Sequence, residues 1–234
     1  MLHSISELDI EKNALFEERQ HVMAIGNFMH KPNIDALCYL KDSIWPIVKK
    51  KNPDIELHIY GAYSSEQHIR FHDIRNRFFI KGFTSNVNTI MQTYRINLAA
   101  LRFGAGLKGK LFDAMQNGLP SICTSIASEG VFGDFDIRNF NADNAEDFAC
   151  KIVTLYKNKA LWERIQILGF ETINKRFNKR VHQDRLMQRI RKITDVLDTH
   201  RLNNFTGLML FHHQLQSTKF MSKWIEEKNA NLKL

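Results

Sequence analysis

The feature that most constrains this chain is the alternation of short apolar runs with helix-like segments over its first two thirds. The apolar runs predict five strands at residues 21–25, 55–60, 78–80, 96–101 and 121–124. The run at 96–101 is almost wholly apolar, which is typical of a strand buried on both faces of a parallel sheet. Strands that alternate with helices in this way predict right-handed βαβ units. The expected fold class is therefore α/β, a Rossmann-like parallel sheet with flanking helices.

The segments between these runs predict the flanking helices. Their ranges are 33–50, 87–94 and 111–117, and a short helix is expected within the polar segment 64–75. In the first of them the apolar residues share one face, and Pro46 is expected to kink the helix near its end. A sixth, weaker strand is expected at 139–141.

From residue 143 onward the pattern is helical only, and it predicts a C-terminal helical tail. The expected helices are 145–156, 160–177, 179–200 and 205–229. We therefore expect a lead-in over 1–20, a Rossmann-like domain over 21–177 and a helical extension over 178–234. The last helix carries Phe211, Leu215, Phe220 and Trp224, and we hypothesise that these residues drive self-association.

The net charge of +8 over 234 residues favours an anionic partner, either a phosphorylated small molecule, nucleic acid or an acidic membrane surface. A basic tail alone would explain the same charge. Nucleic-acid binding through the tail is not expected, because Asp184 and Asp195 interrupt its basic residues. Contact with a membrane surface stays open as an alternative.

The three cysteines, Cys38, Cys123 and Cys150, suit neither a metal site nor a disulfide framework. The N-terminus lacks the pattern of a signal peptide, and no run of about 18 apolar residues occurs. We therefore expect a cytoplasmic protein, with attachment to the inner face of the membrane as a second alternative.

Ligands of open α/β sheets bind beyond the carboxyl ends of the strands, so the loops there are the candidate site. After the first strand come Gly26, Asn27 and His30, and Asn33 is a candidate helix cap. The loop at 104–110 is the sharpest signal, because glycines precede a helix whose first turn carries Lys108 and Lys110. Cations oppose the macrodipole there, which points to a phosphate ligand, although a solvated lysine pair fits too.

Two further features are less specific. Thr124 and Glu129, after the fifth strand, could contact a polar ligand, but capping by hydroxyl side chains explains this segment equally well. Asp113 lies three residues after Lys110 on one helix face, where it could bind a ribose diol or form an ion pair with that lysine.

Together these segments resemble the C-terminal, donor-binding domain of the retaining GT-B glycosyltransferases of the group 1 type. The resemblance rests on IGNFMHKPNIDAL, IWPIVKKKNPDIELHIYGAY, FFIKGF and LRFGAGLKGKLFDAMQNGLPSICTSIASEGV, which occur in the order that the family uses. It spans about residues 22–177.

The resemblance implies a site for a nucleotide diphosphate sugar, with a UDP- or GDP-sugar expected and neither a cofactor nor a metal. Lys108 and Lys110 would act on the diphosphate as the catalytic residues, and Asp113 would bind the ribose. The other residues implied by position are Gly26, Asn27, His30, Lys81, Gly82, Phe83, Gly104, Gly106, Leu107, Thr124 and Glu129. Lys81, Gly82 and Phe83 would lie near the base.

Two departures from the family pattern concern the sugar and the ribose. Ala105 stands where the family often has a sugar-binding Glu, so sugar recognition differs or follows a subgroup with a GxGxK-type loop. Asp113 replaces the usual Glu and is one methylene shorter.

The implied activity is transfer of a sugar to a hydroxyl acceptor in polysaccharide or glycoconjugate synthesis. The chain has room for one half of a GT-B enzyme, so an N-terminal acceptor half is expected as a missing partner. The alternative is a catalytically incomplete binding module that needs a separate acceptor domain.

Overall fold

The structure is a computed structural model that describes residues 14–231, apart from the side chains of residues 213–215 and 229–231. Its internal contacts divide the chain into two compact units, Met1–Lys179 and Arg180–Leu234. We call them unit 1 and unit 2 and describe each by itself.

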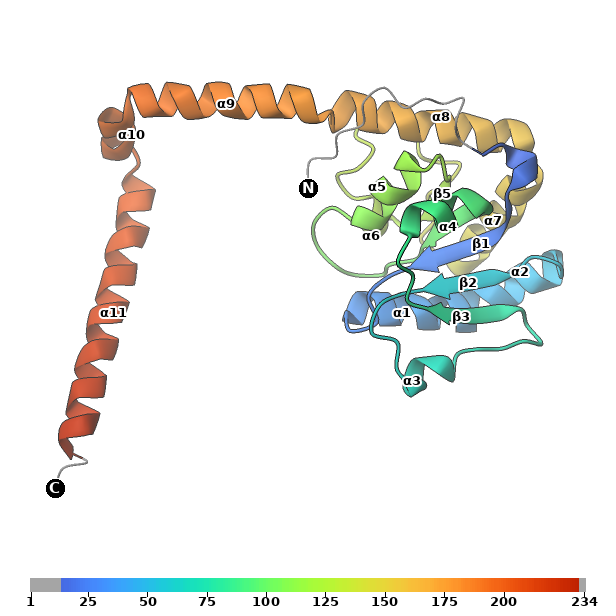
Figure 1. Ribbon diagram of the computed structural model, residues 1–234, viewed down its shortest axis with the longest axis horizontal. Helices are drawn as coiled ribbons and strands as arrows, with labels where there is room; N and C mark the ends of the chain where they lie inside the picture. Colours follow the sequence, from blue (N-terminus) through green and yellow to red (C-terminus); the bar gives the residue numbers. More distant parts are fainter. Residues whose placement is uncertain (1–13, 232–234) are drawn as a thin grey trace. The chain divides into compact units, whose positions relative to one another are not determined.

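Unit 1 is built on a five-stranded parallel sheet (Figure 1). Its strands are β1 (Gln20–Ile25), β2 (Leu57–Tyr60), β3 (Phe78–Gly82), β4 (Tyr94–Ala99) and β5 (Ser121–Cys123). Their order is β3-β2-β1-β4-β5, so the chain reverses its direction of winding at β1, between β2 and β4. Val22 of β1 pairs with Leu57 on one side and with Ile96 on the other. Open α/β sheets bind ligands beside such a point of reversal, beyond the carboxyl ends of the strands. The strand order confirms the predicted Rossmann-like sheet.

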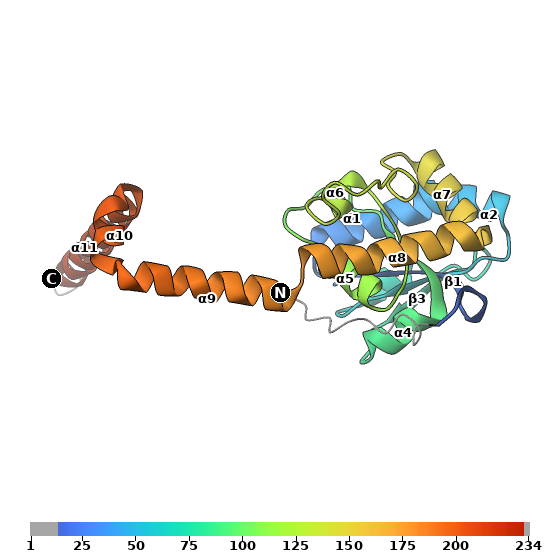
Figure 2. The same cartoon turned by 90° about the horizontal axis from the view of Figure 1, so that it is seen from above.

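Two apolar clusters cover the two faces of the sheet, as the alternation of side chains along a strand requires. Val22 and Ala24 pack into the larger cluster, against α1 (Lys31–Tyr39), α2 (Trp45–Lys51) and α7 (Ala145–Lys157). Met23 enters the smaller cluster with residues of α4 (Val87–Thr93) and α5 (Gly109–Gln116). Figure 2 shows α1 and α7 on one side of the sheet and α4 on the other.

The helix expected at 33–50 begins earlier and has an irregular centre. His30 is its N-cap, so α1 begins at Lys31 and Pro32 lies in its first turn. Asn33 therefore lies inside the helix, and the expectation that it caps the helix is wrong. A π-helical turn at Leu40–Ile44 precedes α2, in which Pro46 lies in the first turn. Proline has no N–H to donate and crowds the preceding turn, so the hydrogen-bonding pattern widens there.

The sixth strand expected at 139–141 is wrong. Asn141 forms only one isolated parallel bridge, to Cys123. The backbone bonds on either side of that bridge join Cys123 to Phe140 and Ala142. Pairing stops there because Asn144 caps α7 directly afterwards.

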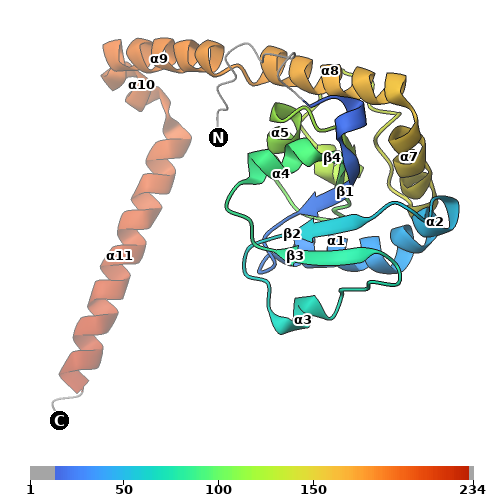
Figure 3. The same cartoon turned by 45° about the vertical axis from the view of Figure 1, so that its right-hand side comes forward.

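The remaining elements of unit 1 are short except for one helix. They are η2 (Phe16–Glu18), α3 (Glu66–Ile69), α6 (Ser125–Ser128) and α8 (Lys159–Arg176). Figure 3 shows β2 lying between β1 and β3, with α3 on the connection that leads from β2 to β3.

Arg19, just before β1, is fully buried. Its guanidinium donates to the carbonyl oxygens of Met91 at 2.9 Å and Asn117 at 2.8 Å. Burial lowers the pKa of Arg19 to about 10. These bonds tie the chain before β1 to α4 and to the end of α5, so this residue is part of the core although the sequence pattern suggested a polar lead-in.

Unit 2 consists of α9 (Lys179–Asp195), α10 (Leu197–Asn203) and α11 (Phe205–Asn231). The single helix expected at 179–200 is wrong, because it breaks at Val196, whose φ and ψ are −126° and 34°. Ile193, Thr194 and Val196 are β-branched residues with reduced helix propensity, which makes this the weakest point of the segment. None of the described helices is long and apolar enough to cross a membrane.

Candidate functional site

A cleft of about 330 Å³ opens at the carboxyl edge of the sheet. It is formed by the loops after β1, β2 and β3 and by one face of α5. Its lining residues are Ile25, Gly26, Asn27, Asn33, Gly61, Ala62, Phe83, Thr84, Val87, Lys110 and Asp113. Its size is in the range of ordinary small-molecule sites, and its lining combines apolar side chains with a few polar ones.

Two glycines allow the loops after β1 and β2 to pack against each other at the base of the cleft. A Cβ on Gly61 would overlap the carbonyl oxygen of Gly26, and a Cβ on Gly26 would lie 2.6 Å from Cγ of Asn33. The backbone N–H of Gly26 donates to the carbonyl of Tyr60 at 3.0 Å. Larger residues at these positions would push the loops apart, so the glycines set the shape of the cleft.

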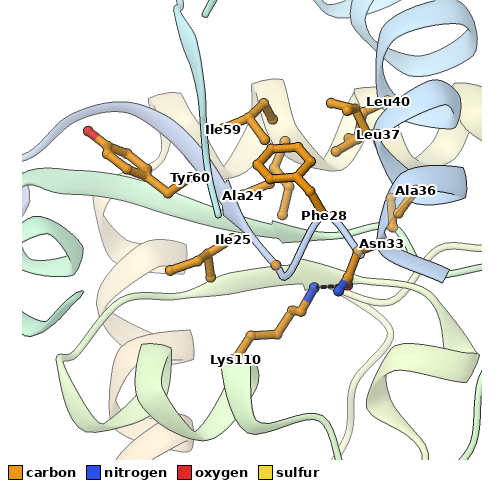
Figure 4. A pocket seen from close by; sticks show the side chains of 13 residues that line it. Ala24, Ile25, Phe28, Asn33, Ala36, Leu37, Leu40, Ile59, Tyr60 and Lys110 are labelled. Carbon is orange, nitrogen blue, oxygen red and sulfur yellow. Dashed lines mark hydrogen bonds between the residues drawn. The ribbon is translucent and has the colours of Figure 1, made fainter. Parts of the chain in front are cut away.

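Lys110 is the basic side chain that lines the cleft. Its Nζ donates to Oδ1 of Asn33 at 2.8 Å, across from α5 to the first turn of α1 (Figure 4). The amide nitrogen of Asn33 in turn donates to the carbonyl of Asn27 at 3.0 Å. Burial, and secondarily the charge of Lys108, lower the pKa of Lys110 to about 8. An anion in the cleft would offset both unfavourable effects.

The glycine-rich loop brings α5 to the cleft. Gly106 adopts a φ of +74°, which favours glycine, and Lys108 is the N-cap residue of α5. Nζ of Lys108 lies 2.5 Å from the carbonyl oxygen of Gly106, so this lysine folds back on its own loop. Before the loop, Nε of Arg102 donates to Asp35 of α1 at 2.8 Å. Because Lys110 in the first turn of α5 bonds Asn33 in the first turn of α1, the N-terminal ends of these helices, each with partial positive charge, face the same region.

A small apolar cavity of about 30 Å³ adjoins the cleft and shares Gly26, Asn33 and Lys110 with it. Figure 4 shows that the ring of Phe28 lines this cavity, between the side chains of α1 and those of β1 and β2. Phe28 is buried, and its ring lies 4.8 Å from that of His68. The cavity provides a low-dielectric wall beside the ammonium of Lys110, which is the cause of its lowered pKa.

Five of the residues that the sequence singles out line this cleft together. They are Gly26, Asn27, Phe83, Lys110 and Asp113. They come from two loops and one helix, which only the sheet order brings to one edge.

The other predicted residues do not line the cleft. They are His30, Lys81, Gly82, Gly104, Gly106, Leu107, Lys108, Thr124 and Glu129. His30 caps α1, and the ammonium of Lys81 lies over the ring of Phe79 at 5.3 Å. Thr124 is buried and caps α6 through a bond from the N–H of Ala127 at 3.2 Å, as the capping interpretation expects. Glu129 is exposed where α6 ends.

The sequence analysis did not predict that Asn33 and Gly61 line the cleft. Asn33 has the pattern of an ordinary helix cap, so nothing in the sequence indicated that it contacts Lys110. Gly61 could have been found, because it directly follows a strand as Gly26 does.

The model of the family described as "Glycosyl transferases group 1" matches residues 19–158 of this sequence. The chain belongs to this family. The match includes the loops after β1 to β5 and the start of α5, and thus every residue that lines the cleft. Among the described residues, no group of three or more His, Cys, Asp or Glu side chains could hold a metal ion.

A curated relative is an uncharacterised 44.6 kDa protein in the cps region of Klebsiella pneumoniae, 28% identical over 167 residues. The match covers 68% of this chain and 43% of that protein, so the chain spans less than half of the relative's length.

Solved structures show the same fold. A TarM variant from S. aureus, in complex with fondaparinux, alpha-GlcNAc-glycerol and UDP, is 18% identical with a TM-score of 0.64. The alignment covers 79% of this chain and 38% of TarM. The C-terminal domain of a group 1 glycosyl transferase, LpcC from Francisella tularensis, is 16% identical with a TM-score of 0.53. That alignment covers 76% of this chain and 96% of the domain. Unit 1 therefore has the fold of the C-terminal half of a GT-B enzyme.

Proposed function

We propose that unit 1 binds a nucleotide diphosphate sugar in this cleft and is the donor-binding half of an enzyme that transfers the sugar to a hydroxyl acceptor. Family membership supports glycosyl transfer, and the complex of TarM with UDP supports a uridine nucleotide as the first donor to test. A role in polysaccharide or glycoconjugate synthesis is part of the same proposal.

The contact between Lys110 and Asn33 is the main observation that supports the proposal. Partial burial of an ammonium costs free energy when its hydrogen-bond partner is a neutral amide, because no opposite charge compensates for the lost hydration. It becomes favourable when an anion enters, because a phosphate oxygen forms a short, charge-assisted bond with the ammonium. The N-terminal ends of α1 and α5 add positive potential at the same place.

The chemistry follows from where charge develops. When the bond between the sugar and the diphosphate breaks, negative charge grows on the leaving phosphate oxygen. Fixed donors at that point stabilise the transition state more than the ground state. We assign this role to Lys110, with Lys108 as a second cation that reaches the diphosphate when its side chain leaves the carbonyl of Gly106.

The rest of the cleft is suited to the nucleoside. We assign to the carboxylate of Asp113, one helical turn from Lys110, the role of accepting hydrogen bonds from a ribose diol. Phe83 is 72% exposed at the rim of the cleft, where its ring can stack on a base. Each of these assignments is a prediction for a bound nucleotide.

The test is a calorimetric titration of the chain with UDP, GDP, ADP and CMP, followed by the sugar conjugates of any nucleotide that binds. We expect one diphosphate to bind, and we expect Lys110→Ala and Lys108→Ala each to weaken it more than tenfold, about 1.4 kcal/mol. Lys175→Ala is the control, because this lysine pairs with Glu171 on α8 outside the cleft. Unchanged affinity in the Lys110 variant would remove the basis of the proposal.

The second candidate is a module that binds the nucleotide but does not turn it over. Both candidates predict binding, and release of free nucleotide in the presence of a hydroxyl acceptor separates them.

A further inference from the structure

Unit 2 exposes an unusual amount of apolar surface. Among the described residues of α9 and α10 none is buried. Leu186 and Ile190 of α9 are 55% and 47% exposed, and Phe220 and Trp224 of α11 are 62% and 59% exposed. Single exposed apolar side chains need no explanation, but a continuous series along successive helices indicates a surface that binds something.

The apolar residues of α9 form a stripe with basic borders. Leu186, Ile190 and Ile193 follow the spacing i, i+4, i+7, which places them on one face of the helix. On a helical wheel the exposed side chain of Met187 widens this stripe on one side, where Arg191 borders it, and Arg189 lies on the other border. Long arginine side chains at such borders can keep their charge in water while their stems cover apolar surface.

The second half of α11 also has an apolar face. Phe220, Met221 and Trp224 share it, and Lys219 and Lys223 lie along one side of it together with Glu226 and Glu227. The ammonium of Lys228 lies 5.0 Å from the centre of the Trp224 ring. Tryptophan with a neighbouring lysine is typical of side chains that lie at a boundary between an apolar phase and water.

Charge decides which partner fits this surface. Between residues 180 and 234, Lys and Arg outnumber Asp and Glu two to one. A second copy of the chain would bring the same excess of positive charge against it, and a nucleic acid would leave the apolar stripes uncovered. An anionic lipid surface matches both components, since it accepts apolar side chains below a layer of negative charge.

We propose that unit 2 docks on an anionic lipid surface through the apolar faces of α9 and the second half of α11, bordered by their basic residues. The helices lie in the plane of the surface, with the apolar side chains below the headgroups. This inference is independent of the nucleotide site in unit 1.

The test uses the fluorescence of the full chain with vesicles. Trp45 and Trp162 are buried, whereas Trp224 is exposed, so a change in emission on binding reports Trp224. We expect a blue shift with vesicles of phosphatidylcholine and phosphatidylglycerol, quenching by brominated lipid chains, and neither effect with phosphatidylcholine alone. Trp224→Phe should remove the signal while co-sedimentation with vesicles persists.

Two variants separate the charged from the apolar contribution. Each basic residue near an anionic surface contributes about fivefold, so Arg189→Gln with Arg191→Gln should weaken binding about 25-fold. Phe220→Ser with Trp224→Ser should weaken it more than 100-fold, because two large apolar side chains are lost. Ile74→Ser is the matched control, since this residue is equally apolar and 71% exposed but lies in unit 1. Absence of vesicle binding, or equal binding to neutral and anionic vesicles, would overturn the proposal, as would self-association that occurs without lipid.

Discussion

Replacing Lys110 by methionine should stabilise unit 1 and damage its site at the same time. Methionine has similar length and no charge, so it fills the same space without a buried ammonium. Burial lowers the pKa of Lys110 from 10.5 to about 8, which corresponds to about 3 kcal/mol of unfavourable free energy for the charged form. Partial exposure of the side chain reduces this figure to about 2 kcal/mol, and the lost bond to Asn33 costs about 1 kcal/mol. We therefore expect a net gain of about 1 kcal/mol at pH 7.

The stability difference between the methionine variant and the natural protein should depend on pH. Between pH 8 and 10.5 the unfolded chain holds a proton on Lys110 that the folded chain has lost, so the stability of the natural protein rises with pH in this window. Below pH 8 both states are charged and the folded state bears the full burial cost. The advantage of the methionine variant should be complete below pH 8 and disappear as the pH rises to 10.5.

The assay is urea unfolding of both proteins at pH 7 and pH 10, with calorimetric titration of UDP at pH 7. We expect a higher unfolding midpoint for the variant at pH 7 only, together with a UDP affinity that is at least tenfold lower. Lys175→Met is the control, because an exposed lysine has no burial cost to remove. A variant that is less stable at pH 7, or one that binds UDP normally, would refute the reasoning.

Three further predictions follow from other contacts. Asn33→Leu removes the acceptor of Lys110, so UDP affinity should fall about tenfold and stability in urea should fall by about 1–3 kcal/mol, because the buried ammonium loses its partner. A normal affinity would show that this contact does not position the ammonium. Asp113→Asn should weaken UDP binding about fivefold but leave inorganic pyrophosphate binding unchanged, and equal losses for the two ligands would exclude a ribose contact. Arg19→Met should destabilise the protein by about 3–5 kcal/mol in urea unfolding, because buried carbonyls of α4 and α5 lose their donor. A loss below about 1 kcal/mol would show that these carbonyls find other partners.

Much of unit 1 could be predicted because its signals are local. The apolar run at 96–101 and the glycine loop after it predict a buried strand followed by a helix, and β4 and α5 confirm both. The predicted ends of helices are less accurate where two local effects favour different end points. The helix at 31–51 begins two residues early because Pro32 suits a first turn, and the helix at 179–195 ends early at a β-branched segment.

The candidate site was predictable in part. Gly26, Asn27, Phe83, Lys110 and Asp113 do line one cleft, as residues at the carboxyl edge of a parallel sheet should. Lys108 and Lys110 are indistinguishable in the sequence, yet one folds back onto Gly106 and the other crosses to Asn33. That difference depends on the exact direction in which α5 leaves its loop, which no local pattern encodes.

The alternation of strands and helices, the glycines that release backbone N–H groups and the family of the chain can all be inferred from the amino-acid sequence. These properties depend on neighbouring residues, through periodicity, helix propensity and turn chemistry. The burial of Arg19 in the core and the hydrogen bond between Lys110 and Asn33 depend on how the chain packs in three dimensions. Arg19 contacts residues 72 and 98 positions away, and Lys110 meets a residue 77 positions away. Contacts of that separation arise from the order of the strands, and the burial that shifts the pKa of Lys110 exists only once the sheet and its helices have packed.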